Sequence, residues 1–404
     1  MFAVLATHPI QYQIPLWKEL ARRDRSPFEI WYLTKHGVQP SLDAQFGQVV
    51  RWDIDLLGGY PYRFPPEPVA EQLGGFWDVR LGADFRKRLV GGGVKAILVH
   101  GWNVRACWEA VWIAHHERVK VWMRGDSNDL KIDRGAKGLV KRWLLGGLLG
   151  RVDRFLCVGE ANRRLYRRYG VREERLVSGL HGVDNDRFKA QARRYLPERD
   201  TVRRAWGVPD GAFCLLYVGK FIKKKRPLDL VTAARSLVGS DMSRAYHLLF
   251  VGSGQLGDEV RRQTCVVYDA ESGTTAVSVD SSAPSASFTG FLNQTEISKA
   301  YVAADVLVLP SDVAETWGLV VNEAMASGLP CVVSAACGCA EDLVVPLDPR
   351  LTYPCGDVAA LAASIRHLAE HPVPTSAIKE RIARYDYRAT VDTLERLWAE
   401  VVAR

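Results

Sequence analysis

Short apolar runs alternate with helical patterns along this chain, and the alternation constrains its fold more than any other feature. The runs are rich in β-branched and aromatic residues and stand at 2–6, 28–33, 96–100, 119–123 and 155–158, then at 213–218, 247–251, 306–309 and 330–333. A run that is apolar throughout indicates a strand buried on both faces, as in parallel sheets whose strands are joined by helices. The sequence therefore predicts an α/β protein with two doubly wound, Rossmann-like domains.

Two domains also suit the length of 404 residues, since a domain usually takes roughly 100–200 residues. We expect the first over residues 1–190 and the second over 205–385. Between them, the stretch from about Val183 to Val208 is dense in Arg, Asp and Pro and predicts a polar connection. Residues 272–287 are rich in Ser, Thr and Ala and predict a surface loop within the second domain.

Several protein classes are excluded by what the sequence lacks. No stretch approaches the roughly 18 uncharged apolar residues of a membrane-spanning helix. The start, Met1 to Pro9, has no basic segment and predicts a strand rather than a signal peptide. The eight cysteines form no CxxC pair, which favours a reduced, cytoplasmic protein over a disulfide scaffold or a zinc site. We interpret Cys337-Gly338-Cys339 as an ordinary loop and expect no metal site.

Positive charge is concentrated in one part of the chain. The net charge is +8, yet residues 131–204 alone hold 20 Lys and Arg against 9 Asp and Glu. Within this block, residues 137–151 mix Trp and Leu with Lys and Arg at near-helical spacing, which suits an anionic membrane surface. An internal helix with a solvated basic face explains the pattern as well, and the glycines in this segment weaken any helix there. No nucleic-acid-binding motif accompanies the charge, so we expect no nucleic-acid partner.

Two glycine-containing loops follow predicted strands of the second domain. In the first, Gly219-Lys220 precedes a cationic run that includes Lys225, and such cations can neutralise a diphosphate. A solvated lysine run is the alternative. The second loop begins at Gly252 and formally matches GxGxxG, a weak motif when it stands alone. Asp269 stands where a dinucleotide site needs an acidic residue, but no clean strand is evident before it.

The strongest signal follows the predicted strand 306–309. Gly318 there opens a predicted helix whose first N–H groups suit a phosphate. Glu315 precedes this helix, and we expect Glu323 about two turns inside it. Two carboxylates beside an anion site would repel the anion unless they bind hydroxyl groups, as sugars and ribose provide. A capping Glu and a surface Glu would explain the spacing equally well.

These residues resemble the signature of retaining glycosyltransferases of family 4, which have the GT-B fold. The family's E-x7-E element matches Glu315 to Glu323, and its G-[RK]…K element matches Gly219-Lys220 with Lys225. The stretches 181–188, 288–291 and 337–341 also fit in order and spacing. The resemblance covers the second domain and is looser over residues 1–180. It implies two Rossmann-like domains facing across a cleft, with a C-terminal helix over about 386–404 that packs back on the first domain.

The resemblance implies a role for each donor-side residue. Lys220 and Lys225 would clamp the diphosphate of a nucleotide-sugar and stabilise charge on the leaving group, with no metal or other cofactor required. Backbone N–H groups would bind the phosphate at Gly318, Leu319 and Val320.

By the same resemblance, Glu323 would hold the ribose hydroxyls and Glu315 the hydroxyls of the donor sugar. Thr316 and Trp317 are the candidates for shaping the sugar pocket. The remaining expected donor-side residues are Gly219, Gly252 and Phe291.

The first domain departs from the family pattern on the acceptor side. Residues 7–12 occupy the place of a common Gly-Gly turn, and no histidine stands near 124–127, where many members have one. The candidate acceptor-side residues are His8, Gln11, His100, Arg124 and Asp126. His8 and His100 could equally be structural.

The resemblance therefore implies a cytoplasmic enzyme of polysaccharide biosynthesis, and the basic segment 137–151 would allow it a peripheral place on the inner face of the membrane. It would move a sugar from a nucleotide-diphosphate donor to a hydroxyl group of a glycan or lipid-linked acceptor, with retention at the anomeric carbon. The same fold hosts nucleotide-sugar epimerases, and a non-catalytic protein that binds sugar or a membrane surface is a further alternative.

Overall fold

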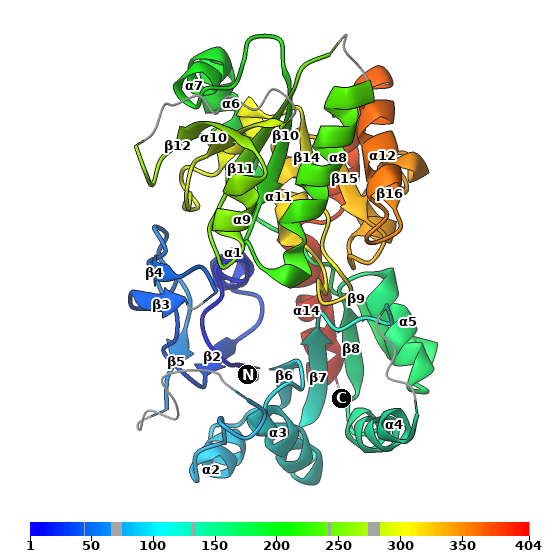
Figure 1. Cartoon of the computed structure of the whole chain (residues 1–404). Coiled ribbons are helices and arrows are strands. Elements are labelled where there is room, and N and C mark those ends of the chain that lie inside the picture. Colours follow the sequence, from blue (N-terminus) through cyan, green and yellow to red (C-terminus); the bar gives the residue numbers. More distant parts are fainter. Residues whose placement is uncertain (44, 66–74, 131–134, 241–243, 274–282, 404) are drawn as a thin grey trace. The chain divides into compact units, whose positions relative to one another are not determined.

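The structure is a computed structural model that describes residues 1–43, 45–65, 75–130, 135–240, 244–273 and 283–403. By its contacts the chain divides into two compact units. The first comprises Met1–Ser41, Val50–Val183 and Asp386–Arg404, and the second comprises Leu42–Val49 and Asp184–Tyr385. Each unit contains a seven-stranded sheet with helices packed against it (Figure 1).

The sheet of the first unit is parallel throughout, in the order β5-β2-β1-β6-β7-β8-β9. Its first strand therefore lies between β2 and β6, which makes the gap between β1 and β6 the point where the strand order reverses. The strands are β1 (Phe2–Ala6), β2 (Phe28–Tyr32), β5 (Tyr62–Arg63), β6 (Ala96–His100), β7 (Lys120–Gly125), β8 (Arg154–Cys157) and β9 (Leu176–Ser178).

Alternate side chains of these strands enter two different cores. Phe2 and Val4 of β1 pack in a core that includes residues of α1 and α14, whereas Ala3 and Leu5 pack in one that includes residues of α2, α3 and α4. The helix at the C-terminus of the chain thus belongs to the first unit. The helices are α1 (Ile14–Arg23), α2 (Phe85–Gly91), α3 (Arg105–His116), α4 (Ala136–Leu149), α5 (Glu160–Arg168), the 3₁₀ turn η1 (Glu173–Arg175) and α14 (Tyr387–Val402).

The sheet of the second unit is also parallel, in the order β12-β13-β11-β10-β14-β15-β16. Here the order reverses between β10 and β14. The strands are β10 (Phe213–Val218), β11 (Tyr246–Val251), β12 (Cys265–Asp269), β13 (Ser285–Phe288), β14 (Val306–Leu309), β15 (Cys331–Ser334) and β16 (Thr352–Tyr353). A separate two-stranded sheet pairs β3 (Ser41–Asp43) with β4 (Gln48–Val50).

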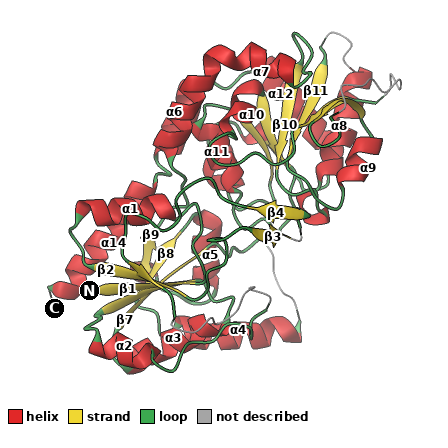
Figure 2. Cartoon of the chain, turned by 90° about the vertical axis from the view of Figure 1, so that its left-hand side faces the viewer, coloured by secondary structure: helices red, strands yellow, loops and turns green. Residues whose placement is uncertain are grey.

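Helices of the second unit form two groups. One group contains α8, α9 and α12, and the other contains α6, α7, α10, α11 and α13. The crossover connections run in opposite directions from the reversal point. Because such crossovers are right-handed, their helices lie on opposite faces of the sheet. Figure 2 shows the strands flanked by helices. The helices are α6 (Asn185–Tyr195), α7 (Arg199–Ala205), α8 (Pro227–Ser240), α9 (Gly257–Arg262), α10 (Ser298–Ala303), α11 (Leu319–Ala326), α12 (Val358–Glu370) and α13 (Thr375–Ala383).

Shorter helical turns complete the second unit. They are η2 (Leu196–Glu198), η3 (Lys223–Lys225), η4 (Ala340–Val344) and η5 (Pro349–Leu351), of which η4 is a π-helix.

The prediction of a polar connection from Val183 to Val208 is wrong, because α6 and α7 fill most of it. Their few apolar residues are supplemented by buried arginine. Arg203 is 7% exposed, and its guanidinium donates to the carbonyl oxygen of Ala303 at 2.9 Å and to Asp305 at 3.2 Å. A helix that packs through an arginine bonded to buried carbonyl groups lacks an apolar residue at that position. Its sequence therefore does not show the regular apolar spacing by which a helix is recognised. Of the predicted loop at 272–287, residues 274–282 lie outside the described residues, and Ser285–Phe288 forms β13.

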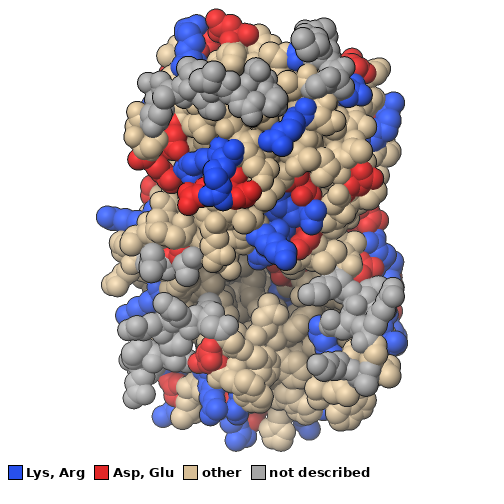
Figure 3. Space-filling model, viewed as in Figure 1, with Lys and Arg blue, Asp and Glu red and all other residues tan. Residues whose placement is uncertain are grey.

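The basic segment 137–151 does form a helix, α4, despite its glycines. Leu145, Leu148 and Leu149 are buried in the core of the first unit and anchor it. On the face seen in Figure 3, basic side chains are mixed with acidic ones rather than gathered in one continuous patch. None of the helices in the described ranges is long and apolar enough to span a membrane.

Candidate active site

Loops at the carboxyl ends of β10 and β14 flank the reversal point of the second sheet, where ligands of doubly wound proteins bind. The loop after β10 carries Gly219, Lys220 and Lys225, and the loop after β14 carries Glu315 and Gly318. The topology therefore brings together the two strongest sequence motifs. Tyr217, at the end of β10, donates its hydroxyl hydrogen to the carbonyl oxygen of Lys220 at 2.9 Å, which fixes the start of the lysine loop.

Glycine is required where neighbouring loops approach each other. Gly252 follows β11 with φ of 120°, and a Cβ atom there would overlap the carbonyl oxygen of Gly219. The N–H of Gly252 donates to the carbonyl oxygen of Gly290 at 2.8 Å, and that of Gly219 donates to Val251 at 3.0 Å. The loops after β10, β11 and β13 are thus joined directly through their backbones. This close approach explains the glycines without a redox dinucleotide.

The prediction that no clean strand precedes Asp269 is wrong, because β12 ends at this residue. The carboxylate of Asp269 accepts a hydrogen bond from Arg261 of α9 at 2.7 Å. It is therefore held in an ion pair with the helix that follows the GxGxxG segment.

Gly318 is the N-cap of α11, with φ of 105°. A Cβ atom at Gly318 would lie 2.7 Å from Cδ2 of Leu309, so both the backbone conformation and the space favour glycine. Leu319 and Val320 form the first turn of the helix, where N–H groups have no intrahelical acceptor and the helix dipole favours an anion. The predicted helix start is thus confirmed. Glu323, however, lies about one turn inside the helix rather than two.

Each of the two site lysines contacts a carboxylate of the same unit. Lys225 forms an ion pair with Glu315, which joins the loops after β10 and β14. Lys220 Nζ lies 2.8 Å from Oδ2 of Asp43 and 3.1 Å from Oε1 of Gln45. Asp43 and Gln45 belong to the β3–β4 segment, which sequence reasoning did not connect with the site.

Aromatic contacts hold the β3–β4 segment against the loops after β10, β11 and β13 of the same unit. The Lys220 ammonium lies 4.9 Å from the ring centroid of Phe46, and that ring meets Phe291 edge to face at 5.4 Å. Ser253 Oγ donates to the carbonyl oxygen of Phe46 at 2.7 Å. Phe291, a predicted site residue, therefore lies beside Phe46.

Glu323 is almost fully buried, with 2% of its surface exposed. Its Oε2 accepts a hydrogen bond from the hydroxyl group of Tyr301 in α10. In the turn before the helix, Trp317 Nε1 donates to Oδ1 of Asn322 at 2.8 Å, and the Trp317 ring packs against Tyr385. Trp317 is thus a buried anchor of the loop, whereas its neighbour Thr316 is half-buried.

Cys337 and Cys339 are buried, and burial raises the pKa of both thiols well above the usual value. Within the described residues, no group of three or more His, Cys, Asp or Glu side chains is placed to hold a metal ion.

The acceptor-side candidates all lie in the first unit, at or after the carboxyl ends of β1, β6 and β7. His8 follows β1 and its Nδ1 lies 2.9 Å from the hydroxyl oxygen of Thr7. Burial, and then the proximity of His36, lowers the pKa of His8 to about 4. Gln11 lies in the turn that precedes α1.

His100 ends β6, and its Nδ1 lies 3.2 Å from Nε2 of Gln13. Burial, and then the charge of Arg124, lowers the pKa of His100 to about 3, so its imidazole is neutral at pH 7. Arg124 is 5% exposed and donates to the carbonyl oxygens of Gly179 at 3.0 Å and Leu180 at 3.1 Å. Burial lowers the pKa of Arg124 to about 10. These contacts bind β7 to the segment after β9.

Asp126 follows β7 and is half-buried, and its charge favours the protonated form of Arg124. His181 also lies near Arg124, and burial followed by that charge lowers the pKa of His181 well below its usual value. Gln13, His36 and His181 are polar residues near the candidates that sequence reasoning did not assign to the acceptor side. His36 and His181 follow β2 and β9, and His181 also opens the stretch 181–188 that fits the family pattern, whereas Gln13 lies in the turn before α1.

Comparisons with known proteins cover different parts of the chain. Residues 212–371 match the family model described as glycosyl transferases group 1. A D-inositol 3-phosphate glycosyltransferase of Catenulispora acidiphila is 32% identical over 234 residues, which are 56% of this chain and 52% of that protein. A GDP-mannose-dependent alpha-mannosyltransferase of Mycobacterium tuberculosis is 32% identical over 223 residues, 54% of this chain and 47% of that protein. The chain thus spans about half the length of these relatives.

Solved structures resemble the whole chain at low sequence identity. Sucrose-phosphate synthase from Thermosynechococcus elongatus gives a TM-score of 0.64 at 18% identity, covering 100% of this chain and 99% of that one. A glycosyltransferase from Rickettsia africae gives 0.69 at 12% identity, covering 99% and 98%. Anabaena HepE in complex with UDP gives 0.65 at 15% identity, covering 100% of both. The predicted two-domain GT-B fold is therefore confirmed.

Proposed function

We propose that the protein is a retaining glycosyltransferase that moves a sugar from a nucleotide-diphosphate donor to a hydroxyl group of a glycan or lipid-linked acceptor. The observation that carries the proposal is the meeting of two lysines, two glutamates and a helix N-terminus at the reversal point of the second sheet. Relatives named as glycosyltransferases, one of them GDP-mannose-dependent, and a fold neighbour solved with UDP support a nucleotide-sugar donor.

In this proposal the donor diphosphate binds between Lys220, Lys225 and the first turn of α11. Its negative charge takes the place of the carboxylates of Asp43 and Glu315, which these lysines contact in the structure. Two fixed cations and a helix dipole compensate the charge, so that no metal is required at the diphosphate. Gly219 and Gly252 give the phosphate room to approach the backbone.

Glu323, supported by Tyr301, would accept hydrogen bonds from the ribose hydroxyls. Glu315 would bind hydroxyl groups of the donor sugar, with Thr316 beside it and Trp317 fixing the turn. Phe291 would border the same site from the loop after β13. On the acceptor side, His8, Gln11, His100, Arg124 and Asp126 would position the attacking hydroxyl group.

During transfer, the bond from the anomeric carbon to the diphosphate oxygen breaks and a bond to the acceptor oxygen forms on the same face. The acceptor's proton passes to the departing phosphate oxygen. Lys225 would stabilise the charge that builds on this oxygen, which is the interaction that accelerates the step. A cytoplasmic location, in part at the inner membrane surface, is consistent with such a donor.

The donor site can be tested by measuring thermal shifts with UDP, GDP, ADP, dTDP and their sugar conjugates, followed by transfer assays with the nucleotide that binds. Ligands that bind the folded state raise the melting temperature. We expect a selective shift that is lost in Glu323→Ala. Transfer should fall by roughly 100-fold or more in Lys225→Ala.

Lys223→Ala is the matched control, because Lys223 lies in the same turn but is exposed. Equal turnover in Lys225→Ala and wild type would contradict the proposal. Conversion of the nucleotide-sugar without an acceptor would favour an epimerase. Selective binding without any turnover would favour the non-catalytic sugar-binding alternative.

A further inference from the structure

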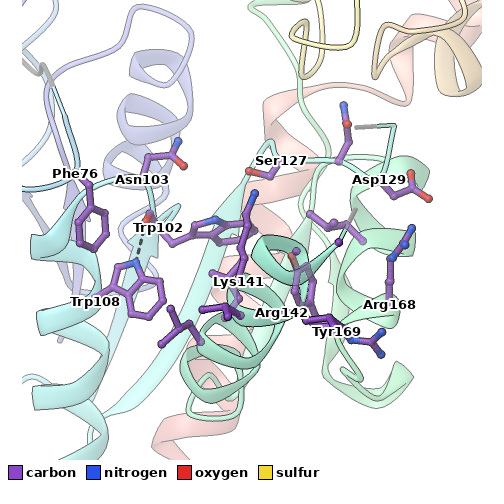
Figure 4. A pocket seen from close by; sticks show the side chains of 18 residues that line it. Phe76, Trp102, Asn103, Trp108, Ser127, Asp129, Lys141, Arg142, Arg168 and Tyr169 are labelled. Carbon is purple, nitrogen blue, oxygen red and sulfur yellow. Dashed lines mark hydrogen bonds between the residues drawn. The ribbon is translucent and has the colours of Figure 1, made fainter. Parts of the chain in front are cut away.

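A pocket of about 1010 Å³ lies in the first unit, between α3, α4 and α5 and the loops that follow β6 and β7 (Figure 4). Its volume is at the upper end of the range for small-molecule sites, roughly 300–1,000 Å³. The apolar side chains around it include Phe76, Trp102, Trp108, Leu144, Leu165 and Tyr169.

The aromatic wall of this pocket is held in place by direct contacts. Trp108 Nε1 donates to the carbonyl oxygen of Trp102 at 2.9 Å. The rings of Phe76 and Trp108 meet edge to face, with centroids 6.0 Å apart. The Trp102 ring meets that of Tyr166 at 6.1 Å in the same way. A wall fixed like this is ready for an apolar ligand without rearrangement.

Helix α4 presents apolar side chains in two directions. Leu145 is buried in the core, yet Leu139 is 69%, Val140 58%, Trp143 77% and Leu144 46% exposed. Leu139, Val140 and Leu144 also line the pocket, whereas Trp143 does not. Exposed apolar residues grouped on one helix usually mark a binding surface. Here the exposed group continues directly into the pocket.

The charges beside the pocket are mainly positive. Lys141, Arg142 and Arg168 line it and are exposed. The acidic side chain at its edge, Asp129, accepts hydrogen bonds from Arg164 at 3.0 Å and 3.2 Å, so its charge is compensated. Figure 4 shows Lys141 and Arg142 on α4, between Trp108 on one side and Arg168 on the other. An anionic group attached to an apolar chain matches this arrangement.

The polar end of the pocket points to the acceptor side. Asn103 and Ser127 line it, and they follow β6 and β7 within a few residues of His100 and Asp126. Asn162 Nδ2 donates to the carbonyl oxygen of Ser127 at 2.6 Å and fixes this part of the loop. A ligand in the pocket would therefore begin at the strand ends that carry the acceptor-side candidates.

We propose that this pocket binds the hydrocarbon chain of a lipid-borne acceptor that carries an anionic group such as a phosphate. The hydrocarbon chain lies between the aromatic wall and α4, and the anionic group lies near Lys141, Arg142 and Arg168. The acceptor's hydroxyl group then points toward the ends of β6 and β7. The identity of this ligand as the acceptor rests on the proposed function. The binding of a hydrocarbon chain in the pocket does not.

Isothermal titration with monomeric alkyl phosphates tests the pocket without any donor. The probes are hexyl, octyl, decyl and dodecyl phosphate, each kept below its micelle concentration. Because one buried methylene contributes about 0.8 kcal/mol, we expect one-to-one binding whose affinity rises roughly tenfold for every two carbons. An affinity that does not depend on chain length would overturn the proposal.

Two substitutions on α4 separate the pocket from its exterior. Leu144→Asn places an amide in the pocket and should weaken dodecyl phosphate binding about tenfold or more. Trp143→Ser is the matched control, exposed on the same helix but outside the pocket lining, and should change the affinity by no more than about twofold. An equal loss of affinity for dodecyl phosphate in both variants would indicate adsorption to the outer face of α4. It would refute the proposal that the alkyl chain binds in the pocket.

The outcome is independent of the donor-site tests. Chain-length-dependent binding in a protein that shows no nucleotide shift would uphold the pocket and contradict the transferase proposal. Transfer to a short soluble acceptor, with no binding of any alkyl phosphate, would uphold the transferase and overturn this inference. Lys141→Gln together with Arg142→Gln should weaken dodecyl phosphate more than dodecanol, since only the phosphate carries charge.

Discussion

Replacing Asp43 by asparagine should make the protein bind nucleoside diphosphates more tightly. Asp43 Oδ2 lies 2.8 Å from Lys220 Nζ, the ammonium group that we propose for the donor diphosphate. Burial alone would raise the pKa of Asp43. Hydrogen bonds from Lys220 and from the backbone N–H of Phe46 nevertheless lower it below its usual value. A diphosphate must therefore displace a carboxylate that already binds the lysine.

The magnitude follows from the exposure of the pair. The side chains of Lys220 and Asp43 are 25% and 32% exposed, so the ion pair is neither deeply buried nor fully screened. Pairs of this kind contribute up to about 1 kcal/mol, which leaves the ammonium available in roughly one molecule in six. Asp43→Asn should therefore lower the dissociation constant for a nucleoside diphosphate by up to about sixfold. The gain should shrink at 0.5 M salt, since salt screens the pair.

Isothermal titration of the preferred nucleoside diphosphate into wild type, Asp43→Asn, Lys220→Ala and the double variant measures the effect as a cycle. The gain should disappear in the Lys220→Ala background. Glu271→Gln serves as the control, because it removes a carboxylate paired with Arg261 at 2.9 Å, away from the lysine loop. Unchanged or weaker binding in Asp43→Asn would refute the reasoning. A gain that persists without Lys220 would show that the carboxylate acts through another group.

Three further outcomes are expected. Gly252→Ala should destabilise the protein by about 2 kcal/mol or more, because the new Cβ atom would overlap the carbonyl oxygen of Gly219. Gly211 is also at positive φ but has open space around it, so Gly211→Ala should lower the melting temperature less. Burial first, and then Arg203, lowers the pKa of His247 to about 3, so stability should fall as pH drops below about 6.5. The share of this loss that comes from His247 is about 2 kcal/mol between pH 7 and 5 in urea unfolding. His247→Leu should reduce the pH dependence by that share, while the exposed His371→Gln keeps it. Tyr301→Phe should weaken nucleoside diphosphate binding by about tenfold, because the Glu323 carboxylate loses a hydrogen bond. Pyrophosphate binding, measured in the same titration, should not change. Equal weakening of both ligands would contradict a ribose role for Glu323.

Much of the fold could be predicted because it depends on local patterns. Strands buried on both faces, such as β10 and β14, appear in the sequence as uninterrupted apolar runs, and each predicted run is a strand in the structure. Helices α6 and α7 were missed for a physical reason. Arg199 and Arg203 support α7 through bonds to carbonyl oxygens and Asp305, so its packing leaves little apolar period in the sequence.

The donor-side motifs could be predicted because they stand at strand ends, and in a parallel sheet all carboxyl ends meet at one edge. Contacts between distant segments could not. Asp43 precedes Lys220 by more than 170 residues, and no period or spacing connects the two. Tyr301 likewise reaches Glu323 from a different helix, so the sequence showed the carboxylate without its donor. The pocket beside α4 was also hidden, since its lining comes from five separate stretches of chain, around residues 76, 102–108, 127–129, 135–145 and 165–169.

The ion pairs of Lys220 and Lys225 have an electrostatic consequence for donor binding. Both lysines that would bind the diphosphate are already paired with carboxylates, Lys225 with Glu315 and Lys220 with Asp43. Binding is then an exchange of anionic partners rather than the filling of an unopposed cationic site. Because each displaced carboxylate retains its own charge nearby, the net attraction for a diphosphate is smaller than two lysines suggest. In the proposed mechanism Glu315 would become available for sugar hydroxyls only when Lys225 turned to the phosphate. Diphosphate binding and sugar recognition should then be coupled through this ion pair.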